Sequence, residues 1–417
     1  MSKKRKTAEV EEVVYERCCG IDVHKDDVKV CLNIGGRKEV KTFSTMTKDL
    51  LAMADWLKYY GVQMVAMEST GSYWKPVFNI LECKDVPAIL VNPQHIKNLS
   101  EPKTDVRDSR WISSLLRHGL LRASFVPKRD MRELRELVKY RSSLCEDSTR
   151  TLNRIDKVLQ GANIKLSSVI STTDTKTELA IIGALANGES DTSALAKLAQ
   201  GSLKKKEHEI KQALNGLIGE HQRMLLKSMY NHLRQIKEEI AVIEAEIDNR
   251  MKKDAEIIER LDEIPGVGKT TAQAILAEIG TNMEQFPDEA HLASWAGVCP
   301  GQNESAGKRK SGKTRKGNSN LKKTLVQCAN SASHCKQSYL SAQFKRIAAR
   351  RGRKRAIVAV AHTILIICYF LIKDGVRYED LGSDFFDKRK KSAIARRSIK
   401  RLESLGFDVI VKLKEAS

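Results

Sequence analysis

The sequence lacks the cysteine spacing of a disulfide framework or of a structural zinc site. Its nine cysteines are odd in number and scattered, and no two of them are separated by exactly two residues. The basic first residues are followed by no apolar segment, so we expect no secretory signal. These absences favour a protein of the reducing cytoplasm.

Long hydrophobic runs are also scarce. The longest, AIVAVAHTILIICYFLI at 356–372, carries His362 and Thr363 in its middle. It lies at the short limit for crossing a bilayer, which takes roughly 17–25 residues. A buried core helix is therefore the favoured interpretation, with no membrane partner, and a membrane span is the alternative.

Positive charge, in contrast, is in excess. Lysine and arginine total 73 against 52 aspartates and glutamates, which gives a formal net charge of +21. Such an excess repels itself unless a polyanion neutralises it, so nucleic acid is the expected partner. An anionic membrane surface and a merely solvated basic surface are the alternatives.

The first part of the chain has the pattern of an α/β domain. Strand-like runs at 18–34, joined at 24–27, and at 37–44 precede segments that alternate between helix and strand. The predicted order is three strands, helix, strand, helix, strand and helix. Hairpin-linked strands followed by this alternation predict one mixed sheet covered by helices.

Later segments are expected to be mainly helical. Apolar residues repeat at alternating steps of three and four from Leu226 to Ile247, which predicts a helix that pairs with another. The partner is either a helix near 131–159 or a second subunit. Residues 161–204 are rich in Ser, Thr, Gly and Ala, and we expect a weakly ordered insertion there.

These patterns predict five segments. They are a disordered basic tail (1–15), an α/β domain (16–127), a helical or coiled-coil region with an insertion (128–260), a mainly helical C-terminal domain (261–375) and a second basic tail, partly helical (376–417).

Four acids stand out against this organisation. Asp22 interrupts an apolar strand, Glu68 closes another, and Asp105 and Asp108 share one face at the start of a helix. Each alone is explained as a strand-edge or first-turn helix acid. Together they are what an RNase H-like nuclease fold needs, and clustered carboxylates would take up protons unless a cation neutralised them. Oxygen-only ligands select Mg²⁺ or Mn²⁺.

Two basic segments, 308–323 and 344–355, suit contacts to phosphate better than base reading. IPGVGKT, with Gly266 and Gly268, has the pattern of a helix-hairpin-helix turn and not of a nucleotide-hydrolysing Walker loop. Tyr73 and Trp74 either stack on a base or pack in the core. The candidate basic residues are Lys308, Arg309, Lys310, Lys313, Arg315, Lys316, Lys322, Lys323, Arg350, Arg351 and Arg353.

Several motifs, in order, carry a family resemblance: GIDVHK, MESTGSYW, VNPQHIKNL, KTDVRDSRWI, IPGVGKTTAQAILAEIG, ASWAGVCPGQNESAGKRK and RKGNSNLKKTLVQCA. With these the chain resembles the DEDD-type insertion-sequence transposases, the "insertion sequence one-ten" family of bridge-RNA-guided serine recombinases. The resemblance covers roughly residues 17–125 and 255–375. It leaves 161–204 without a counterpart in the short members.

The resemblance implies a first domain similar to a Holliday-junction resolvase (RuvC-like), with Asp22, Glu68, Asp105 and Asp108 as its acidic tetrad. It further implies a catalytic serine at Ser305, double-stranded DNA as substrate, a structured guide RNA and a homo-oligomer, dimer or tetramer. Composition alone does not separate Ser305 from Ser311 or Ser319. A hydrolytic junction resolvase that uses only the tetrad, and a non-enzymatic nucleic-acid-binding scaffold, are the alternative functions.

Overall fold

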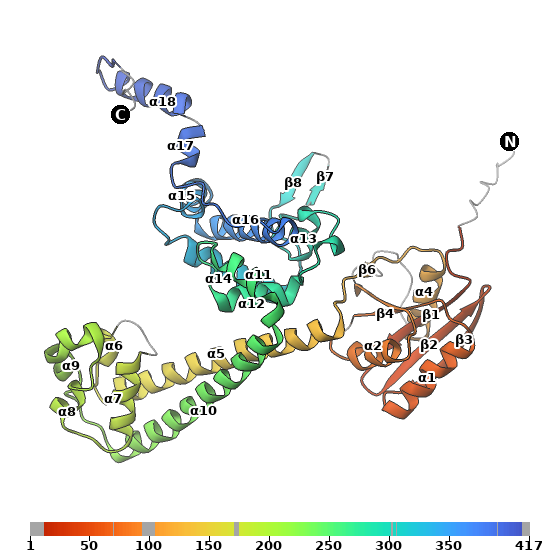
Figure 1. Ribbon diagram of the computed structural model, residues 1–417, viewed down its shortest axis with the longest axis horizontal. Helices are drawn as coiled ribbons and strands as arrows, with labels where there is room; N and C mark the ends of the chain where they lie inside the picture. Colours follow the sequence, from red (N-terminus) through yellow and green to blue (C-terminus); the bar gives the residue numbers. More distant parts are fainter. Residues whose placement is uncertain are drawn as a thin grey trace. The chain divides into compact units, whose positions relative to one another are not determined.

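The computed structural model divides into two compact units, Met1–Arg129 and Asp130–Ser417, which we describe separately (Figure 1). The predicted N-terminal tail lies almost wholly outside the described residues. The structure describes residues 12–69, 71–93, 105–170, 175–301, 303–305, 307–389 and 391–410, and for 105–107, 303–305 and 308–310 it describes the backbone only.

The first unit is built on a six-stranded mixed sheet with the order β3-β2-β1-β4-β5-β6. β1, β4 and β5 run parallel to one another, whereas β2, β3 and β6 pair antiparallel with their neighbours. The strands are β1 (Arg17–Val23), β2 (Asp27–Ile34), β3 (Arg37–Ser44), β4 (Met64–Glu68), β5 (Ala88–Val91) and β6 (Ala123–Ser124). The predicted mixed sheet is confirmed; the two-residue β6 was not predicted.

Helices cover both faces of this sheet (Figure 1). The side chains of β1 alternate, so Cys19 and Ile21 pack with α1 (Thr47–Tyr59) and α2 (Trp74–Cys83). Cys18 faces the other way and packs with α4 (Asp105–Arg117). The sheet therefore has an α1/α2 face and an α4 face.

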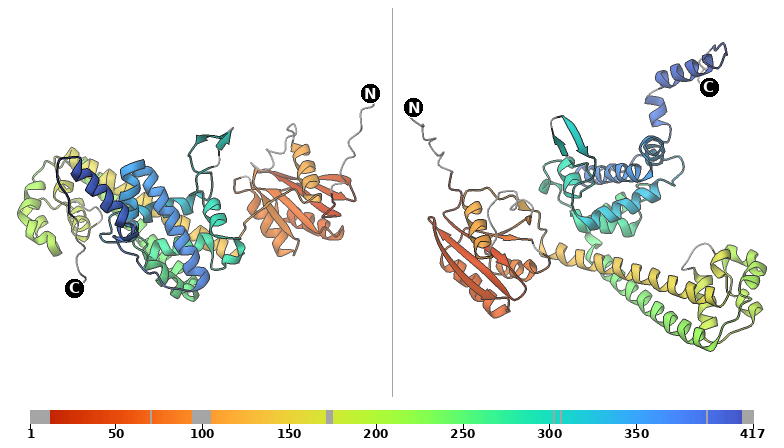
Figure 2. Two further views of the ribbon diagram at one scale, coloured as in Figure 1. Left: turned by 90° about the horizontal axis from the view of Figure 1, so that it is seen from above. Right: turned by 180° about the vertical axis from the view of Figure 1, so that it is seen from behind.

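The second unit contains two long helices that run in opposite directions, α5 (Arg129–Gly161) and α10 (Glu220–Arg250), and they draw apart from one end to the other (Figure 1 and Figure 2). Leu226, Leu233 and Ile247 of the apolar repeat of α10 are fully buried. Leu226 and Leu233 share a core with Leu152 and Ile155 of α5 and with residues of 162–214. Arg250 Nη1 bonds Glu133 Oε2 across the pair at 3.1 Å. The partner of the predicted heptad helix is thus a helix of the same chain.

The prediction of a weakly ordered insertion at 161–204 is wrong, because this segment forms short helices around a buried core. Ile181, Ile182 and Leu195 are at most 1% exposed and pack against the ends of α5 and α10. The elements are α6 (Leu166–Val169), α7 (Lys176–Ala186), α8 (Thr192–Ala196), η1 (Gly201–Lys206) and α9 (Glu207–Ala213).

The remaining helices pack around α16 (Arg353–Asp374). By length and apolarity alone α16 qualifies as a membrane span. Its residues from Ala356 to Ile372 are largely buried, however, and it contacts α11, α13, α14 and α15. These are α11 (Ala255–Asp262), α13 (Glu289–Trp295), α14 (Ser319–Ala332) and α15 (Tyr339–Arg351), and α12 (Lys269–Ile279) packs on α11 and α14. The predicted core helix is confirmed.

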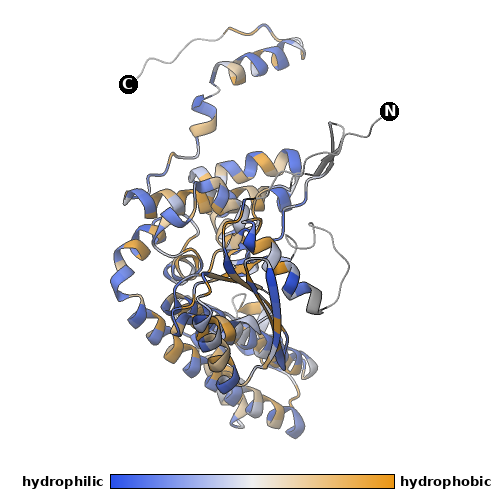
Figure 3. Cartoon of the chain, turned by 90° about the vertical axis from the view of Figure 1, so that its right-hand side faces the viewer, coloured by the Kyte–Doolittle hydropathy of each residue, from blue (hydrophilic) through white to orange (hydrophobic). Residues whose placement is uncertain are grey.

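The C-terminal tail is partly helical, as predicted, with α17 (Phe385–Arg389) and α18 (Lys391–Glu403). α18 buries no residue and is largely hydrophilic (Figure 3). Its stability therefore does not come from tertiary packing within the described part of the chain.

Candidate active site

Adjacent parallel strands bring Asp22 and Glu68 together. Ile21 of β1 is in register with Met67 of β4, so the next residues, Asp22 and Glu68, follow side by side. Alternation puts both on the α4 face, because Ile21 and Met67 belong to the opposite core. The side chain of Asp22 is 14% exposed, which makes its charge costly.

A glycine sets how closely α4 crosses this face. A Cβ atom on Gly20 would lie 2.3 Å from the carbonyl oxygen of Ser109 and 2.5 Å from the amide nitrogen of Ser113. Backbone thus meets backbone where α4 crosses β1. Since Asp108 directly precedes Ser109, Gly20 positions Asp108 over the strand that carries Asp22. A glycine inside a strand was the signal that could have predicted this contact.

The acids influence one another electrostatically. Burial is the main cause that raises the pKa of Asp22. His24, whose Nε2 lies 3.1 Å from Asp22 Oδ2, lowers that pKa, whereas the charges of Asp108 and Glu68 raise it further. Three of the four predicted acids therefore share one electrostatic environment. His24 was missed as a partner of Asp22, although the Asp-x-His spacing in the sequence was a signal.

The fourth acid, Asp105, begins α4 one helical turn before Asp108, and its side chain lies outside those that the structure describes. Within the described residues, no three His, Cys, Asp or Glu side chains are close enough to hold a metal ion. The donor set nevertheless fits a hard divalent cation, because it offers carboxylate oxygens whose mutual repulsion already raises the pKa of Asp22. Metal binding stays a prediction.

The predicted serine lies in the second unit, in a β-hairpin. β7 (Asn303–Ser305) pairs with β8 (Lys308–Ser311), and Ser305 is opposite Lys308 in the register. Gly307, with φ +72°, makes the turn between them. Ser311 lies in β8 and Ser319 begins α14. The hairpin thus pairs the candidate nucleophile with a lysine-bearing strand, while the Ser305 side chain is outside the described ones.

Two family models match the chain. A model for DEDD transposases of IS110 elements matches residues 19–164, and a model described as "Transposase IS116/IS110/IS902 family" matches residues 258–345. The chain belongs to the IS110 family of transposases. This confirms the family resemblance of its motifs. A comparison with curated proteins found no match.

Some of the predicted basic residues of the transposase are exposed to solvent, and others bond to residues of the same chain. Lys313, Arg315 and Lys316 are exposed in the loop between β8 and α14. Lys322 Nζ instead donates to Thr314 Oγ1 at 2.6 Å, and Lys323 forms an ion pair with Glu146 of α5. Arg350, Arg351 and Arg353 are exposed around the junction of α15 and α16, and Arg353 also bonds Asn330 at 2.8 Å. The side chains of Lys308, Arg309 and Lys310 lie outside the described ones.

The turn of the transposase that precedes α12 has a clear packing role. A Cβ atom on Gly266 would lie 2.4 Å from the amide nitrogen of Ala332 in α14. Gly268 is exposed at the start of α12 and donates its amide to Thr271 Oγ1 at 2.9 Å. Lys269, next to it, pairs with Asp248 at 2.8 Å. Packing thus accounts for Gly266, and phosphate binding at this turn stays a prediction.

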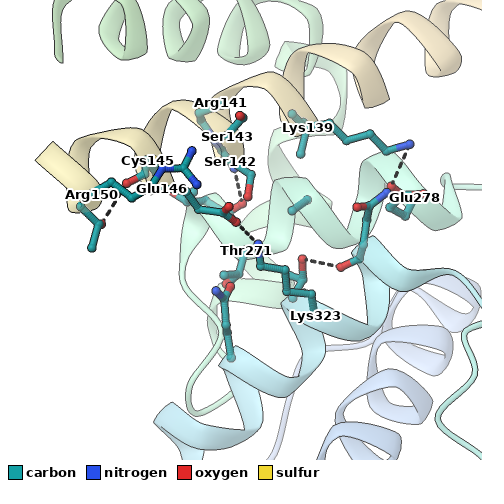
Figure 4. Close-up of a pocket in the computed structure, with 17 residues that line it drawn as sticks. Lys139, Arg141, Ser142, Ser143, Cys145, Glu146, Arg150, Thr271, Glu278 and Lys323 are labelled. Atoms are coloured by element: carbon teal, nitrogen blue, oxygen red, sulfur yellow. Dashed lines mark hydrogen bonds and ion pairs between the residues drawn. The ribbon is translucent and has the colours of Figure 1, made fainter. Parts of the chain in front are cut away.

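A polar groove of about 660 Å³ runs between α5, α12 and α14 in the same unit of the transposase (Figure 4). Its cations are largely neutralised from within, since Lys139 lies 3.9 Å from Glu278 and Lys323 pairs with Glu146. Arg141, only 4% exposed, donates to the Thr270 carbonyl at 3.1 Å. The groove therefore joins α5 to the C-terminal helices and leaves little uncompensated charge for a polyanion.

DNA binding should weaken steeply with salt, and the exposed loop should carry part of that dependence. Each of Lys313→Ala, Arg315→Ala and Lys316→Ala is expected to make the slope of log Kobs against log salt shallower by about 0.9, because one phosphate contact is lost. Lys323→Ala should leave the slope unchanged, because Glu146 already neutralises this lysine. Filter binding at several salt concentrations measures the slopes. Equal effects of all four changes would contradict the division into phosphate-binding residues of the loop and a lysine already neutralised within the protein.

Proposed function

We propose that the protein excises and inserts an insertion sequence by metal-assisted DNA strand exchange, with Ser305 as the nucleophile. Its family supports action on DNA in transposition. The observation that carries the catalytic part is the convergence of Asp22, Glu68 and Asp108 at the α4 face of the sheet, where Asp108 and Glu68 both raise the pKa of Asp22.

The order of strands supports an RNase H-like, RuvC-like assignment of the first unit. A hairpin-linked antiparallel half, β3-β2-β1, continues into the parallel half, β1-β4-β5, with helices on both faces. Glu68 ends β4 at the carboxyl edge, where α/β sheets gather their ligands. Asp22 is in register beside it, so the first unit offers a carboxylate site on a rigid sheet.

In this proposal Asp22, Glu68, Asp105 and Asp108 hold Mg²⁺ or Mn²⁺. When bound, such an ion polarises the phosphodiester and lowers the pKa of the attacking hydroxyl. Asp22 must be ionised to take part, and His24 favours that form because it bonds Asp22 Oδ2 and lowers the pKa of the carboxyl. We propose His24 as a positioning residue that orients Asp22.

The serine step conserves the energy of the phosphodiester. Ser305 Oγ forms a bond to phosphorus, one phosphorus–oxygen bond to deoxyribose breaks, and the hydroxyl proton leaves with the departing deoxyribose oxygen. The reverse attack by a deoxyribose hydroxyl of another strand rejoins the DNA and frees the serine. No nucleotide is consumed. Neighbouring lysines of the hairpin strand β8, which begins at Lys308, are suited to the charge that develops on the phosphate.

We further propose a structured guide RNA and a homo-oligomer, dimer or tetramer, as the resemblance of the motifs implies, acting in the cytoplasm. RNA that co-purifies with the protein, sequenced and compared with the DNA that flanks its gene, tests the first of these. Size determination by light scattering tests the second.

A covalent adduct tests the serine. Incubation with DNA of the insertion-sequence ends and Mg²⁺, followed by denaturation, should leave protein attached to DNA, and Ser305→Ala should abolish this adduct. Ser311→Ala and Ser319→Ala, in the same basic environment, should retain it. Metal-dependent cutting that survives Ser305→Ala would replace the proposal with a hydrolytic, resolvase-like nuclease that uses the acids alone. DNA binding that Asp22→Ala leaves unchanged, with no adduct and no cutting by the wild type, would favour a non-enzymatic scaffold.

A further inference from the structure

A second cavity, of about 770 Å³, lies at the base of the hairpin that carries Ser305. Pro300 and Thr314, which form an isolated β-bridge on either side of the hairpin, both line it. Its other walls come from the loop around Gly312 and from α15 and α16. The described lining residues are Val298, Pro300, Gly312, Lys313, Thr314, Gln343, Lys354, Arg355, Val358, Ala359, His362 and Thr363.

The walls of this cavity, which we call the hairpin-base cavity, suit a flat ring. Val298, Pro300, Val358 and Ala359 supply aliphatic surface from two sides, the hairpin base and α16. His362 adds an imidazole whose pKa is lowered by burial, which favours its neutral form. A neutral aromatic ring between aliphatic walls favours an aromatic ligand over a fully charged one.

One wall carries a hydrogen-bond acceptor that has no partner in the described part of the chain. Gln343 Nε2 donates to Thr363 Oγ1 at 2.9 Å, and the Thr363 hydroxyl donates to the carbonyl oxygen of Ala359 at 3.2 Å. Because the threonine proton is used, its oxygen must accept, and this fixes the orientation of the glutamine amide. Gln343 Oε1 is left buried and unpaired, which costs free energy. Because this atom is shielded from the cavity, the glutamine side chain has to turn before a ligand N–H can recover that cost.

The rim of the hairpin-base cavity is cationic. Lys313, Lys354 and Arg355 are all exposed, and they come from two different segments of the unit. None of the described lining residues is a carboxylate. A ligand that reaches the aliphatic walls must therefore pass uncompensated positive charge, which favours one that carries phosphate.

We infer that the hairpin-base cavity receives a single unstacked nucleotide of a DNA strand. Its base lies between the aliphatic walls, and the flanking phosphates contact Lys313, Lys354 and Arg355. The Gln343 side chain turns toward the base, so that a base N–H donates to Oε1. The inference rests on the proposed function, because strand exchange breaks base pairs next to the exchanged phosphate and leaves bases unstacked. Capture of such a base at the foot of the Ser305 hairpin would hold the opened strand near the nucleophile. Every base has both a ring face and an N–H donor, so the cavity selects an unpaired base more than a particular sequence.

The test compares two DNA probes of the same sequence, one fully paired and one with a short unpaired bubble that contains a single 2-aminopurine. The wild-type protein should prefer the bubble, and binding should change the 2-aminopurine fluorescence. Ala359→Phe fills the cavity and should weaken bubble binding by about tenfold or more, with paired binding unchanged. Gln343→Met, of similar size but without the acceptor, should act in the same direction. Ala349→Phe, at an exposed position of α15, is the matched control and should change neither affinity.

Unchanged bubble preference in both Ala359→Phe and Gln343→Met, each with a wild-type melting temperature, would overturn the inference. So would a preference seen only when the unpaired strand is RNA, since the site would then serve the guide. Failure of the proposed function has a different signature: bubble preference stays sensitive to both variants, while no Ser305-dependent adduct forms. Conversely, if the Ser305-dependent adduct forms but neither variant changes the preference for the bubble probe, the cavity does not bind the base, and the proposed function stands.

Discussion

Replacing Asp22 with asparagine is expected to abolish DNA strand processing while leaving the protein at least as stable. The amide keeps the shape of the side chain but loses the charge that binds a divalent cation. Loss of several kcal/mol of transition-state stabilisation corresponds to a rate on the order of a thousandfold lower. Adduct formation with insertion-sequence DNA over time measures the effect. Asp26→Asn, an exposed change in the neighbouring β1–β2 turn, is the matched control and should retain activity.

The stability half of this prediction has a definite sign. The pKa of Asp22 in the folded protein is raised above its model value of 3.8, so the folded state binds this proton more tightly than the unfolded state. The contribution of Asp22 to stability therefore falls as the pH rises from about 4 through the folded pKa. Asp22→Asn removes this loss, so in the presence of chelator its advantage over the wild type should appear only above that window.

Added Mg²⁺ supplies the complementary measurement. It should raise the melting temperature of the wild type, because an ion that binds only the folded state stabilises it, and should do so much less in Asp22→Asn. If Asp22→Asn melts well below the wild type in chelator at neutral pH, the charge of Asp22 stabilises the folded protein and the prediction is wrong.

Gly20→Ala is expected to cost about 3 kcal/mol or more of folding free energy, because the new methyl group meets the backbone of α4 and neither backbone can yield easily. The clashing atoms are the carbonyl oxygen of Ser109 at 2.3 Å and the amide nitrogen of Ser113 at 2.5 Å. Displacement of α4 also moves Asp108, so strand processing should fall together with stability. Urea unfolding and adduct formation measure the two effects.

Gly312→Ala is the control for this change. Gly312 has no atom within 4 Å of the added Cβ position and does not require a positive φ, so its unfolding should match the wild type. Wild-type stability in Gly20→Ala would show that α4 lifts away at no cost, and would remove Gly20 from the site.

The sheet and the acids were predictable from the sequence because their signals are local. Strand alternation around Asp22 and the apolar run that ends at Glu68 each occupy fewer than ten residues. The first prediction follows from a period of two, and the second follows from a short continuous apolar run. The shared face of Asp105 and Asp108 follows from helical spacing in the same way. What these patterns do not contain is the crossing of α4 over β1, since Gly20 and Ser109 are distant in sequence.

The small helical core at 161–204 escaped prediction for a related reason. α6 and α8 are only four and five residues long, too short to establish a 3.6-residue repeat. Their apolar residues, such as Leu166 and Leu195, are buried in a core that these short helices form with one another and with the ends of α5 and α10. A composition rich in Ser, Thr, Gly and Ala is typical of loops when read alone, and tertiary contacts overrode it.

The hairpin-base cavity was equally invisible in the sequence. Gln343 directly precedes the basic segment 344–355, and Lys354 lies inside it. The turn between α15 and α16 brings both residues to the lining of the cavity. The length and apolarity of residues 356–372 identified α16 as a core helix, yet gave no reason for its partly exposed edge at Ala359 and His362 to face the hairpin.

The paired helices α5 and α10 also fix how the length of this protein can change. At 1.5 Å per residue, the 33-residue α5 spans about 50 Å. Two inserted residues would rotate everything beyond them by roughly half a turn, whereas seven in each helix would preserve the apolar seam and extend it by about 10 Å. The distance from the short helices α6–α9 to the C-terminal helices can therefore change only in steps of whole heptads. Length variants that fold should carry such heptads in both helices at once.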